Sequence, residues 1–291
     1  MRDLSNHPEA VRSRERRAEL SRLYLGPTIP HARRTCEIEN GCVLIGSDAH
    51  YWPGDASTAH RAFVAAIREL QPVAVIMNGD VIDGARVSRW APGHWDDLAS
   101  QPALVDELAT AQTRLREIRA ACAPDTLLFW PMGNHDARFE KYLIQAAPEA
   151  VGIHGTRLKD HFPDWLPCWD VLVNEHDPAP LLVKHRFKGG EYAPRNNTLK
   201  AGVSVVTGHL HSLAVYPFSD LRGTRWGVDC GTLAVPHGPQ FVNYTEDNPV
   251  NWRSGFTVLT FAEGRLLWPE LVHVIDEAAG LICFRGEVWE V

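Results

Sequence analysis

The chain has 291 residues, of which 45% are hydrophobic and 22% are charged, a composition typical of a soluble globular protein. Its formal net charge is −7 at pH 7, which argues against a strong sequence-independent attraction to nucleic acid but leaves a local basic groove open. The first residues lack the apolar segment of a secretory signal, and no apolar run approaches the roughly 18 residues of a membrane span. We therefore expect a soluble cytoplasmic protein with no membrane contact.

The N-terminal region differs in composition from the rest of the chain. Residues 1–40 are polar, rich in arginine and interrupted by Gly26, Pro27 and Pro30. We expect an N-terminal helical arm here, followed by a single domain over residues 41–291. Glutamates stand between the arginines of the arm, a pattern that favours a solvated helix face over a nucleic-acid-binding segment.

Three apolar runs alternate with helical patterns in the first half of the chain. In chain order these elements are a strand at 42–46, a helix at 56–70, a strand at 73–77, a helix at 102–121, a strand at 126–130 and a helix at 137–147. Continuous apolar strands that alternate with helices indicate a sheet that is covered on both faces.

The second half of the chain is rich in strand patterns, with little helix between them. Strand-like segments stand near residues 170–173, 181–184, 203–207, 213–217, 225–230, 256–261, 266–274 and 281–285. Together with the first half, they predict an α/β fold in which two packed mixed β-sheets are flanked by helices.

Side chains that can bind a metal follow five of the apolar runs. In chain order they are Asp48 and His50, Asp80, the run Asn134-His135-Asp136, His185, and the pair His209 and His211. Because open α/β sheets place their sites at the carboxyl ends of strands, we expect these residues to meet. Gly79, Gly133 and Gly208 precede three of the groups and would let the backbone turn sharply and approach a bound group closely. Each group alone is a weak signal, but their recurrence behind five strands indicates a site.

The mixture of donor types restricts which ions the site would hold. Two carboxylates, one amide oxygen and four imidazoles suit Mn, Fe, Zn or Ni better than the all-oxygen sites of Ca or Mg. One carboxylate can bridge two ions about 3.5–4 Å apart, and such a pair clamps a phosphoryl group. It also lowers the pKa of a bridging water, so that hydroxide becomes available for in-line attack. We expect two divalent or trivalent ions, with Mn as the first expectation.

The motif set resembles that of the calcineurin-like metallophosphoesterase superfamily. The pattern DxH, GD, GNH[DE], a histidine and GHxH is met between residue 43 and about residue 235, some two thirds of the chain. The resemblance implies a four-layer sandwich of two sheets flanked by helices, and it divides the ligands between two ions. One ion would be held by Asp48, His50 and His211, the other by Asn134, His185 and His209, and both by Asp80.

Further roles come with the resemblance. His135 corresponds to the non-ligand histidine of the family, which hydrogen-bonds the phosphate or protonates the leaving oxygen. Asp83 matches the acidic residue that orients this histidine, with a turn cap as the alternative reading. A carboxylate partner fixes the tautomer of a histidine and raises its pKa. Arg138, at the start of the helix after GNHD, is a candidate for binding a phosphate oxygen, or else a solvated helix residue.

The fourth motif departs from the family pattern, in which glycine follows the histidine. His185 is followed by Arg186, whereas a literal His-Gly pair stands at His154 and Gly155. That pair lies in a polar loop without a preceding strand, so His185 is the predicted ligand.

The choice of phosphoester depends on residues that are missing. The protein serine/threonine phosphatase branch of the family has GDxVDRG and RGNHE, whereas this chain has GDVIDGA and MGNHD and so lacks the arginines that grip a monoester. We therefore predict hydrolysis of phosphodiesters. The alternatives are a phosphomonoesterase, a nuclease of phage or repair type, and a non-catalytic scaffold. The acidic charge favours a small phosphoester over nucleic acid as the partner, and the N-terminal arm or the C-terminal strands could form a homodimer contact.

Overall fold

The structure is a computed structural model that describes residues 33–89, 95–177, 179–245 and 248–291. Of the predicted arm, residues 1–32 lie outside the described residues. Residues 34–36 form a strand of one of the sheets, so the compact unit begins at Arg33, before the expected boundary at residue 41. Within the described part of the chain, no helix has both the length and the apolar character needed to cross a membrane.

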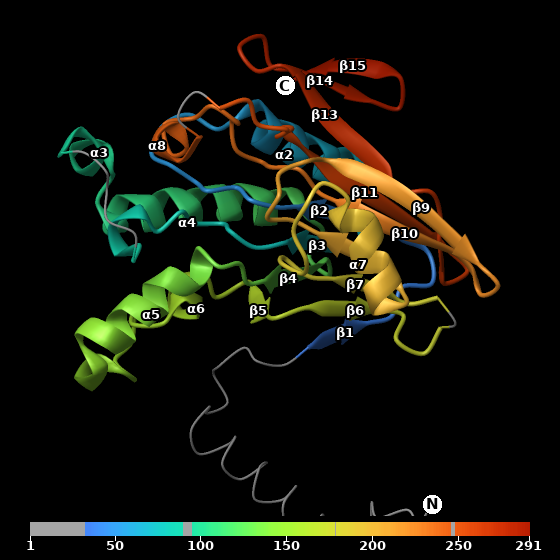
Figure 1. The fold of residues 1–291 in the computed structure, drawn as a ribbon, viewed down its shortest axis with the longest axis horizontal. Helices are drawn as coiled ribbons and strands as arrows, with labels where there is room; N and C mark the ends of the chain where they lie inside the picture. The colour runs from blue at the N-terminus through green and yellow to red at the C-terminus, as the bar shows by residue number, and fades with distance from the viewer. Residues whose placement is uncertain (1–32, 90–94, 178, 246–247) are drawn as a thin grey trace, which may run out of the picture. The chain divides into compact units, whose positions relative to one another are not determined.

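The larger sheet has nine strands, four of which form a parallel half (Figure 1). The parallel strands are β2 (Gly41–Gly46), β3 (Ala74–Met77), β4 (Leu127–Pro131) and β5 (Leu166–Cys168). The antiparallel half continues from β2 through β11 (Gly255–Ala262), β13 (Glu270–Asp276), β14 (Leu281–Phe284) and β15 (Glu287–Glu290), and β12 (Arg265–Leu266) pairs with β11. The three strands expected in the first half of the chain are therefore neighbours, and their carboxyl ends lie on one edge.

The smaller sheet has six strands and is also mixed. In spatial order they are β1 (Arg34–Cys36), β6 (Val171–Val173), β7 (Leu181–Val183), β8 (Ser204–Thr207), β10 (Gly223–Asp229) and β9 (Ala214–Asp220). β7 and β8 run parallel, so the residues that follow them leave the sheet at the same edge.

The helices lie outside the two sheets. They are α2 (Thr58–Leu70), α3 (Trp95–Ser100), α4 (Leu104–Ala121), α5 (Asp136–Ala146), α6 (Leu158–His161), α7 (Ala193–Ala201) and α8 (Val242–Thr245), with short 3₁₀ turns at Ala85–Val87 and Pro148–Ala150. The sequence did not predict α7, because its residues are polar and carry no apolar stripe. Pro194 stands in its first turn, where a missing N–H leaves no bond unmade, and Gly202 ends it in the left-handed conformation.

Alternation along the central strands explains the layers. Val43 and Ile45 of β2 pack between the two sheets, whereas Leu44 packs on the side of α2 and α4. A third, smaller cluster joins Leu172 and Val205 of the small sheet to the end of α7, which lies beside β8 and β10 (Figure 1). The order is therefore helices, large sheet, small sheet and helix. The predicted two-sheet sandwich flanked by helices is confirmed.

Candidate metal centre

Five loops from the two sheets meet at one edge, and hydrogen bonds join them. The loops after β2, β3 and β4 come from the large sheet, and those after β7 and β8 come from the small sheet. The backbone N–H of Asp48 donates to Gly79 O (2.9 Å), and that of Gly208 donates to His185 O (3.0 Å). The N–H of His209 crosses between the sheets to the carboxylate of Asp48, 2.9 Å from Oδ2. The seven predicted ligands are thereby brought toward one place.

The carboxylate of Asp80 lies at the centre of this arrangement. Its Oδ2 is 3.1 Å from His185 Nε2 and 4.0 Å from both His50 Nε2 and His135 Nε2. The side chain is almost fully buried. Burial alone would raise the pKa of Asp80, but the surrounding histidines, His185 foremost, outweigh this and hold it well below its ordinary value. A carboxylate between histidines from both sheets is placed where a bridging ligand would stand.

The side chains form groups that contain six of the seven predicted ligands, all but Asn134. Asp48, His50 and His211 offer ligand atoms within 4.8 Å of one another, and so do Asp80, His185 and His209. Within the first group, Asp48 Oδ1 is 3.1 Å from His211 Nε2. A third group unites His50, Asp80 and His135, so the predicted non-ligand histidine lies against the same centre. His154, the alternative to His185, is exposed in the loop before α6.

The unpaired polar atoms of these residues fit a metal centre. Among the described residues, His50 Nε2, Asn134 Oδ1 and His185 Nε2 are buried without a hydrogen-bond partner. Buried polar atoms are rarely left unpaired in proteins, so several together call for a ligand that supplies the missing partner. His185 Nε2 and Asp80 Oδ2 are 3.1 Å apart without a hydrogen bond between them, about the spacing of two donors that each lie about 2.1 Å from one ion.

Outer hydrogen bonds fix which nitrogen of two histidines faces the centre. His50 Nδ1 donates to Asp83 Oδ1 (2.9 Å), and His185 Nδ1 donates to the backbone oxygen of Asn78 (2.7 Å). In both rings the proton is thereby held on Nδ1, and the lone pair of Nε2 points into the centre. This arrangement, with a carboxylate or carbonyl behind the histidine, is typical of metal ligands.

The backbone at the ligands is in an uncommon conformation. Ten described residues other than glycine have a positive φ, and five of them are predicted ligands: Asp48, His50, Asp80, His209 and His211. This region costs a residue with a side chain about 1–3 kcal/mol, and such residues gather at functional sites. The concentration supports a functional role for this edge, independently of the residue types.

Gly133 allows a close approach between two loops of the centre. A Cβ at this position would overlap the carboxylate and the backbone nitrogen of Asp80. The loops after β3 and β4 can therefore touch only because residue 133 has no side chain, and the N–H of His135 then reaches Asp80 Oδ1 (2.8 Å).

His135, Asp83 and Arg138 form one hydrogen-bonded group beside the centre. His135 Nδ1 lies 2.9 Å from the backbone oxygen of Asp83 and 3.1 Å from its Oδ1, so this nitrogen carries a proton. Arg138 donates through Nη1 to the same backbone oxygen (2.9 Å) and through Nη2 to His135 Nε2 (3.0 Å). Burial lowers the pKa of His135, but Asp83 and Asp80 outweigh it, and the pKa lies above its ordinary value. The structure therefore brings the three residues together, and their roles stay predictions.

Several residues at the centre had no role predicted from the sequence. Asp136, which had no predicted role, is buried and accepts hydrogen bonds from both neighbouring loops, and Glu107 of α4 lies buried behind Asp83. Phe241 packs edge-on against His50 (5.0 Å between ring centroids), and Trp252 lies 4.5 Å from the ring of His211. These contacts join residues far apart in the chain, where no local motif marks them.

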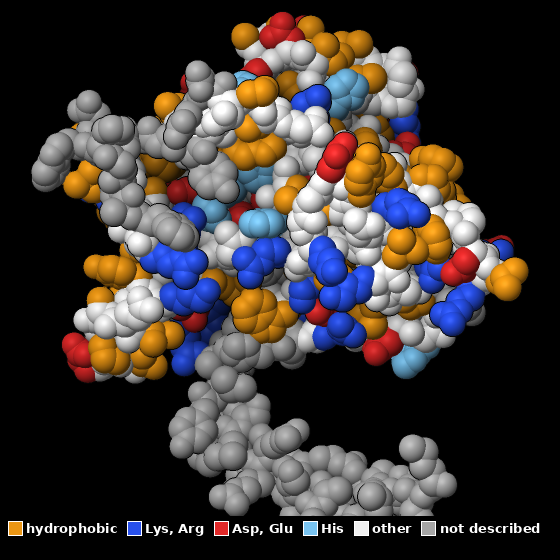
Figure 2. Space-filling view, viewed as in Figure 1, with side chains coloured by type: hydrophobic (Ala, Val, Ile, Leu, Met, Phe, Trp, Pro, Cys, Tyr) orange, Lys and Arg blue, Asp and Glu red, His pale blue; other side chains and the backbone are white. Residues whose placement is uncertain are grey.

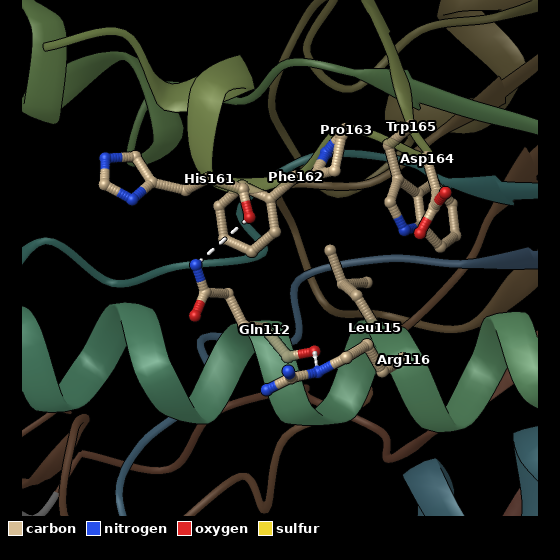
Figure 3. Close-up of a pocket in the computed structure, with 8 residues that line it drawn as sticks. All are labelled: Gln112, Leu115, Arg116, His161, Phe162, Pro163, Asp164 and Trp165. Atoms are coloured by element: carbon tan, nitrogen blue, oxygen red, sulfur yellow. Dashed lines mark hydrogen bonds between the residues drawn. The ribbon is translucent and has the colours of Figure 1, made fainter. Parts of the chain in front are cut away.

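The centre opens at the surface of the molecule. Figure 2 shows histidine side chains at the bottom of a hollow on this face, with Lys and Arg side chains gathered along one side of it. A separate pocket of about 200 Å³ lies between α4 and residues 161–165 and includes none of the predicted site residues. There Gln112 donates to the backbone oxygen of His161 (3.1 Å; Figure 3).

Comparison with known proteins gives distant relatives. No protein-family model matches the chain. The gene 54 protein of Mycobacterium phage L5 is 28% identical over 262 residues, which cover 86% of this chain and 98% of that protein. The solved structure of vacuolar protein sorting 29 from Cryptosporidium parvum aligns with 87% of this chain and 100% of its own, at 12% identity and a TM-score of 0.47. A dimetal phosphatase from Danio rerio aligns with 81% of this chain and 96% of its own, at 10% identity and a TM-score of 0.39.

The resemblance seen in the sequence implied a sandwich of two sheets flanked by helices. Two mixed sheets with outer helices are present, and the motif residues gather where the strands of both sheets end. The two-sheet fold that the resemblance implies is therefore present in this chain.

Proposed function

We propose that the chain is a dinuclear metal-dependent phosphoesterase that hydrolyses phosphodiesters. The observation that carries this proposal is the position of Asp80 between two groups of ligand atoms, with His135 on the same side. Asp48 belongs to one of these groups and His185 to the other, and the carboxylate of Asp80 lies beside both. Two ions bound there would neutralise the charge of a phosphoryl group and supply an activated water as nucleophile.

The protein residues that would act on the substrate are His135 and Arg138. In its neutral form His135 accepts a hydrogen bond at Nε2 from Arg138. When Nε2 is protonated it can no longer accept, and its proton is available to the leaving oxygen as the P–O bond breaks. Asp83, behind Nδ1, stabilises the charged ring, and the guanidinium of Arg138 is free to donate to a non-bridging phosphate oxygen.

The preference for a diester rests on the absence of the arginines found in the protein phosphatase branch. A diester carries one negative charge less than a fully ionised monoester, and Arg138 supplies a cation in contact with His135. A small diester, such as a cyclic nucleotide, is the proposed substrate class, and Mn is the proposed ion.

A nuclease is the second candidate. The cations along one side of the hollow in Figure 2 favour a substrate that carries several phosphates, in spite of the acidic charge of the whole chain. The relatives from phages are compatible with this candidate.

The test is hydrolysis of bis- and mono-(p-nitrophenyl) phosphate by the full chain loaded with Mn, with metal analysis of the same sample. We expect about two ions per chain and a higher kcat/KM for the diester. Cyclic nucleotides and single- and double-stranded oligonucleotides, assayed side by side, separate the small-diester enzyme from the nuclease. A preference for the monoester would establish the phosphomonoesterase, and no bound metal or no hydrolysis would overturn the proposal in favour of a scaffold.

A further inference from the structure

Asp136 is a buried carboxylate whose hydrogen bonds join two of the loops that form the centre. Its Oδ2 accepts from the backbone N–H of Asp80 (2.9 Å) and of Gly133 (2.8 Å), and from the indole Nε1 of Trp130 (2.9 Å). Its Oδ1 accepts from the N–H of Val81 (2.9 Å) and of Ile82 (3.3 Å). Both oxygens of this side chain therefore serve as acceptors, with five N–H donors between them.

Asp136 thus binds the start of the turn formed by residues 80–84, and Glu107 binds the end of this turn. It is fully buried on α4, its Oε1 accepts from the N–H of Gly84, and its carboxyl also hydrogen-bonds the backbone of Asp83. The backbone of residues 80–84 is therefore bonded along its length to two carboxylates, one from α5 and one from α4. The second oxygen of Glu107 is buried without a partner among the described residues.

The turn between these two carboxylates carries two side chains of the centre. Asp80, at its start, has a positive φ of 50° and faces histidines from both sheets. Asp83, near its end, holds Nδ1 of His50 and of His135. No regular strand or helix spans residues 80–84. Besides these bonds, the turn has an isolated bridge between Ile82 and Tyr51 and accepts backbone hydrogen bonds from His50 and Tyr51 at Asp80 O and Val81 O. The two carboxylates bind the N–H side of the turn and so help to set the direction of both side chains.

We propose that Asp136 and Glu107 are positioning residues that hold the turn of residues 80–84, and through it the carboxylates of Asp80 and Asp83, in the geometry that binds the ions. This inference rests on the proposed function. Neither side chain would contact an ion or the substrate. Outer-shell residues of this kind typically change metal affinity 10- to 100-fold when they are replaced.

We expect Asp136 and Glu107 to tolerate different substitutions, and this difference allows a test. Asp136→Asn places an amide N–H₂ against at least two N–H donors whichever way the amide is turned, because both oxygens accept. Glu107→Gln keeps the accepting oxygen at Gly84, whereas Glu107→Ala removes it. Asp160→Asn is the matched control, since Asp160 also accepts from backbone N–H groups (Gly155, 3.0 Å; Arg157, 3.4 Å), and both donors belong to the segment before α6 rather than to the turn of residues 80–84.

The experiment measures Mn²⁺ affinity by calorimetry and hydrogen exchange of the peptide that contains residues 79–84, on the full chain. We expect Asp136→Asn to weaken Mn²⁺ binding at least tenfold and to speed exchange of this peptide, while circular dichroism shows a folded protein. Glu107→Ala should weaken binding about tenfold, and Glu107→Gln should stay within about threefold of the wild type. Asp160→Asn should change neither quantity.

The outcomes separate this inference from the proposed function. Wild-type Mn²⁺ affinity and wild-type exchange in Asp136→Asn would overturn the inference alone. If the wild type binds no Mn²⁺, the proposed function fails and the ion-positioning role fails with it, although faster exchange in Asp136→Asn would still show that the carboxylate holds the turn. Should Asp136→Asn not fold, the contrast between Glu107→Ala and Glu107→Gln decides, and equal affinities of those two variants would count against the inference.

Discussion

The loops of the large sheet and those of the small sheet contribute differently to the centre. The large sheet supplies all the oxygen ligands, from Asp48, Asp80 and Asn134, together with one imidazole. The small sheet supplies only imidazoles, and its loops rest on the large sheet through bonds such as that from His209 N–H to Asp48. The loops after β3 and β4 are also bonded to each other through Asp136, and Glu107 of α4 binds the first of them. The loops after β2, β3 and β4 thus form a hydrogen-bonded frame, and the two loops of the small sheet complete the centre.

The largest effect is expected from Asp80→Asn, which removes the shared carboxylate of the frame. Both ions should lose a ligand, so Mn per chain should fall from about two to below one. The fall in kcat/KM should exceed the roughly 100-fold upper range of outer-shell changes. Metal analysis and diester hydrolysis measure both, with Asp160→Asn as the control. Retention of two ions by the variant would show that Asp80 does not bridge them.

His135→Ala tests the chemistry that the frame supports rather than the frame itself. We expect kcat to fall about 100-fold or more, the range for a lost general acid, while Mn per chain stays unchanged. A substrate with a much better leaving group should regain part of the rate, because it needs no proton. Loss of one ion in this variant would instead make His135 a ligand, as its place beside Asp80 and His50 permits.

His209→Ala should have a smaller effect than Asp80→Asn, because it removes an imidazole from the small-sheet side only. We expect one ion to bind at least about tenfold more weakly while the other keeps its affinity. Stepwise Mn²⁺ titration distinguishes two classes of site in the variant. An equal loss of affinity in both binding steps would show that the small-sheet loops are as much a part of the frame as the large-sheet loops.

The smallest expected effect is a change in the free energy of unfolding with pH, caused by Glu107 beside the frame. Burial raises the pKa of Glu107 to about 7 from an ordinary value of 4.5, so folding favours the protonated form. This contribution to stability is fully present below pH 4.5 and is lost as the pH rises through about 7, by at most about 3 kcal/mol. Urea unfolding in EDTA at pH 5 and at pH 8 should therefore show a larger loss of stability in the wild type than in Glu107→Gln. The same loss in both proteins would assign the pH dependence to other groups.

Much of this site was predictable because its ligands follow strands. A parallel strand brings the residue after it to a known edge, so Asp48, Asp80 and Asn134 were expected together. His185 was preferred to His154 for the same reason, and the structure places it 3.1 Å from Asp80. The fold class followed from the same alternation of apolar runs and helices.

The supporting residues were not predictable, and the reasons are physical. Asp136 acts through backbone groups more than 50 positions away in the chain, and an aspartate at a helix start reads as an ordinary cap. Glu107 stands in the first turn of α4, where an acidic residue is favoured in any helix. Phe241 has the sequence pattern of a core residue, and only its contacts with His50 and His211 in the folded chain give it a place at the centre. Such roles depend on the tertiary partners, which a local pattern does not contain.

The left-handed backbone at five ligands has a consequence for the thermodynamics of the whole chain. Without ions, each of these positions costs folding about 1–3 kcal/mol that a glycine would not. An ion that binds only the folded form returns free energy to it, so the melting temperature should rise with the concentration of free metal. Selection for stability alone would replace residues such as Asp48 or His211 by glycine. As proposed ligands they would lower the stability of the ion-free protein, and metal binding would restore part of it.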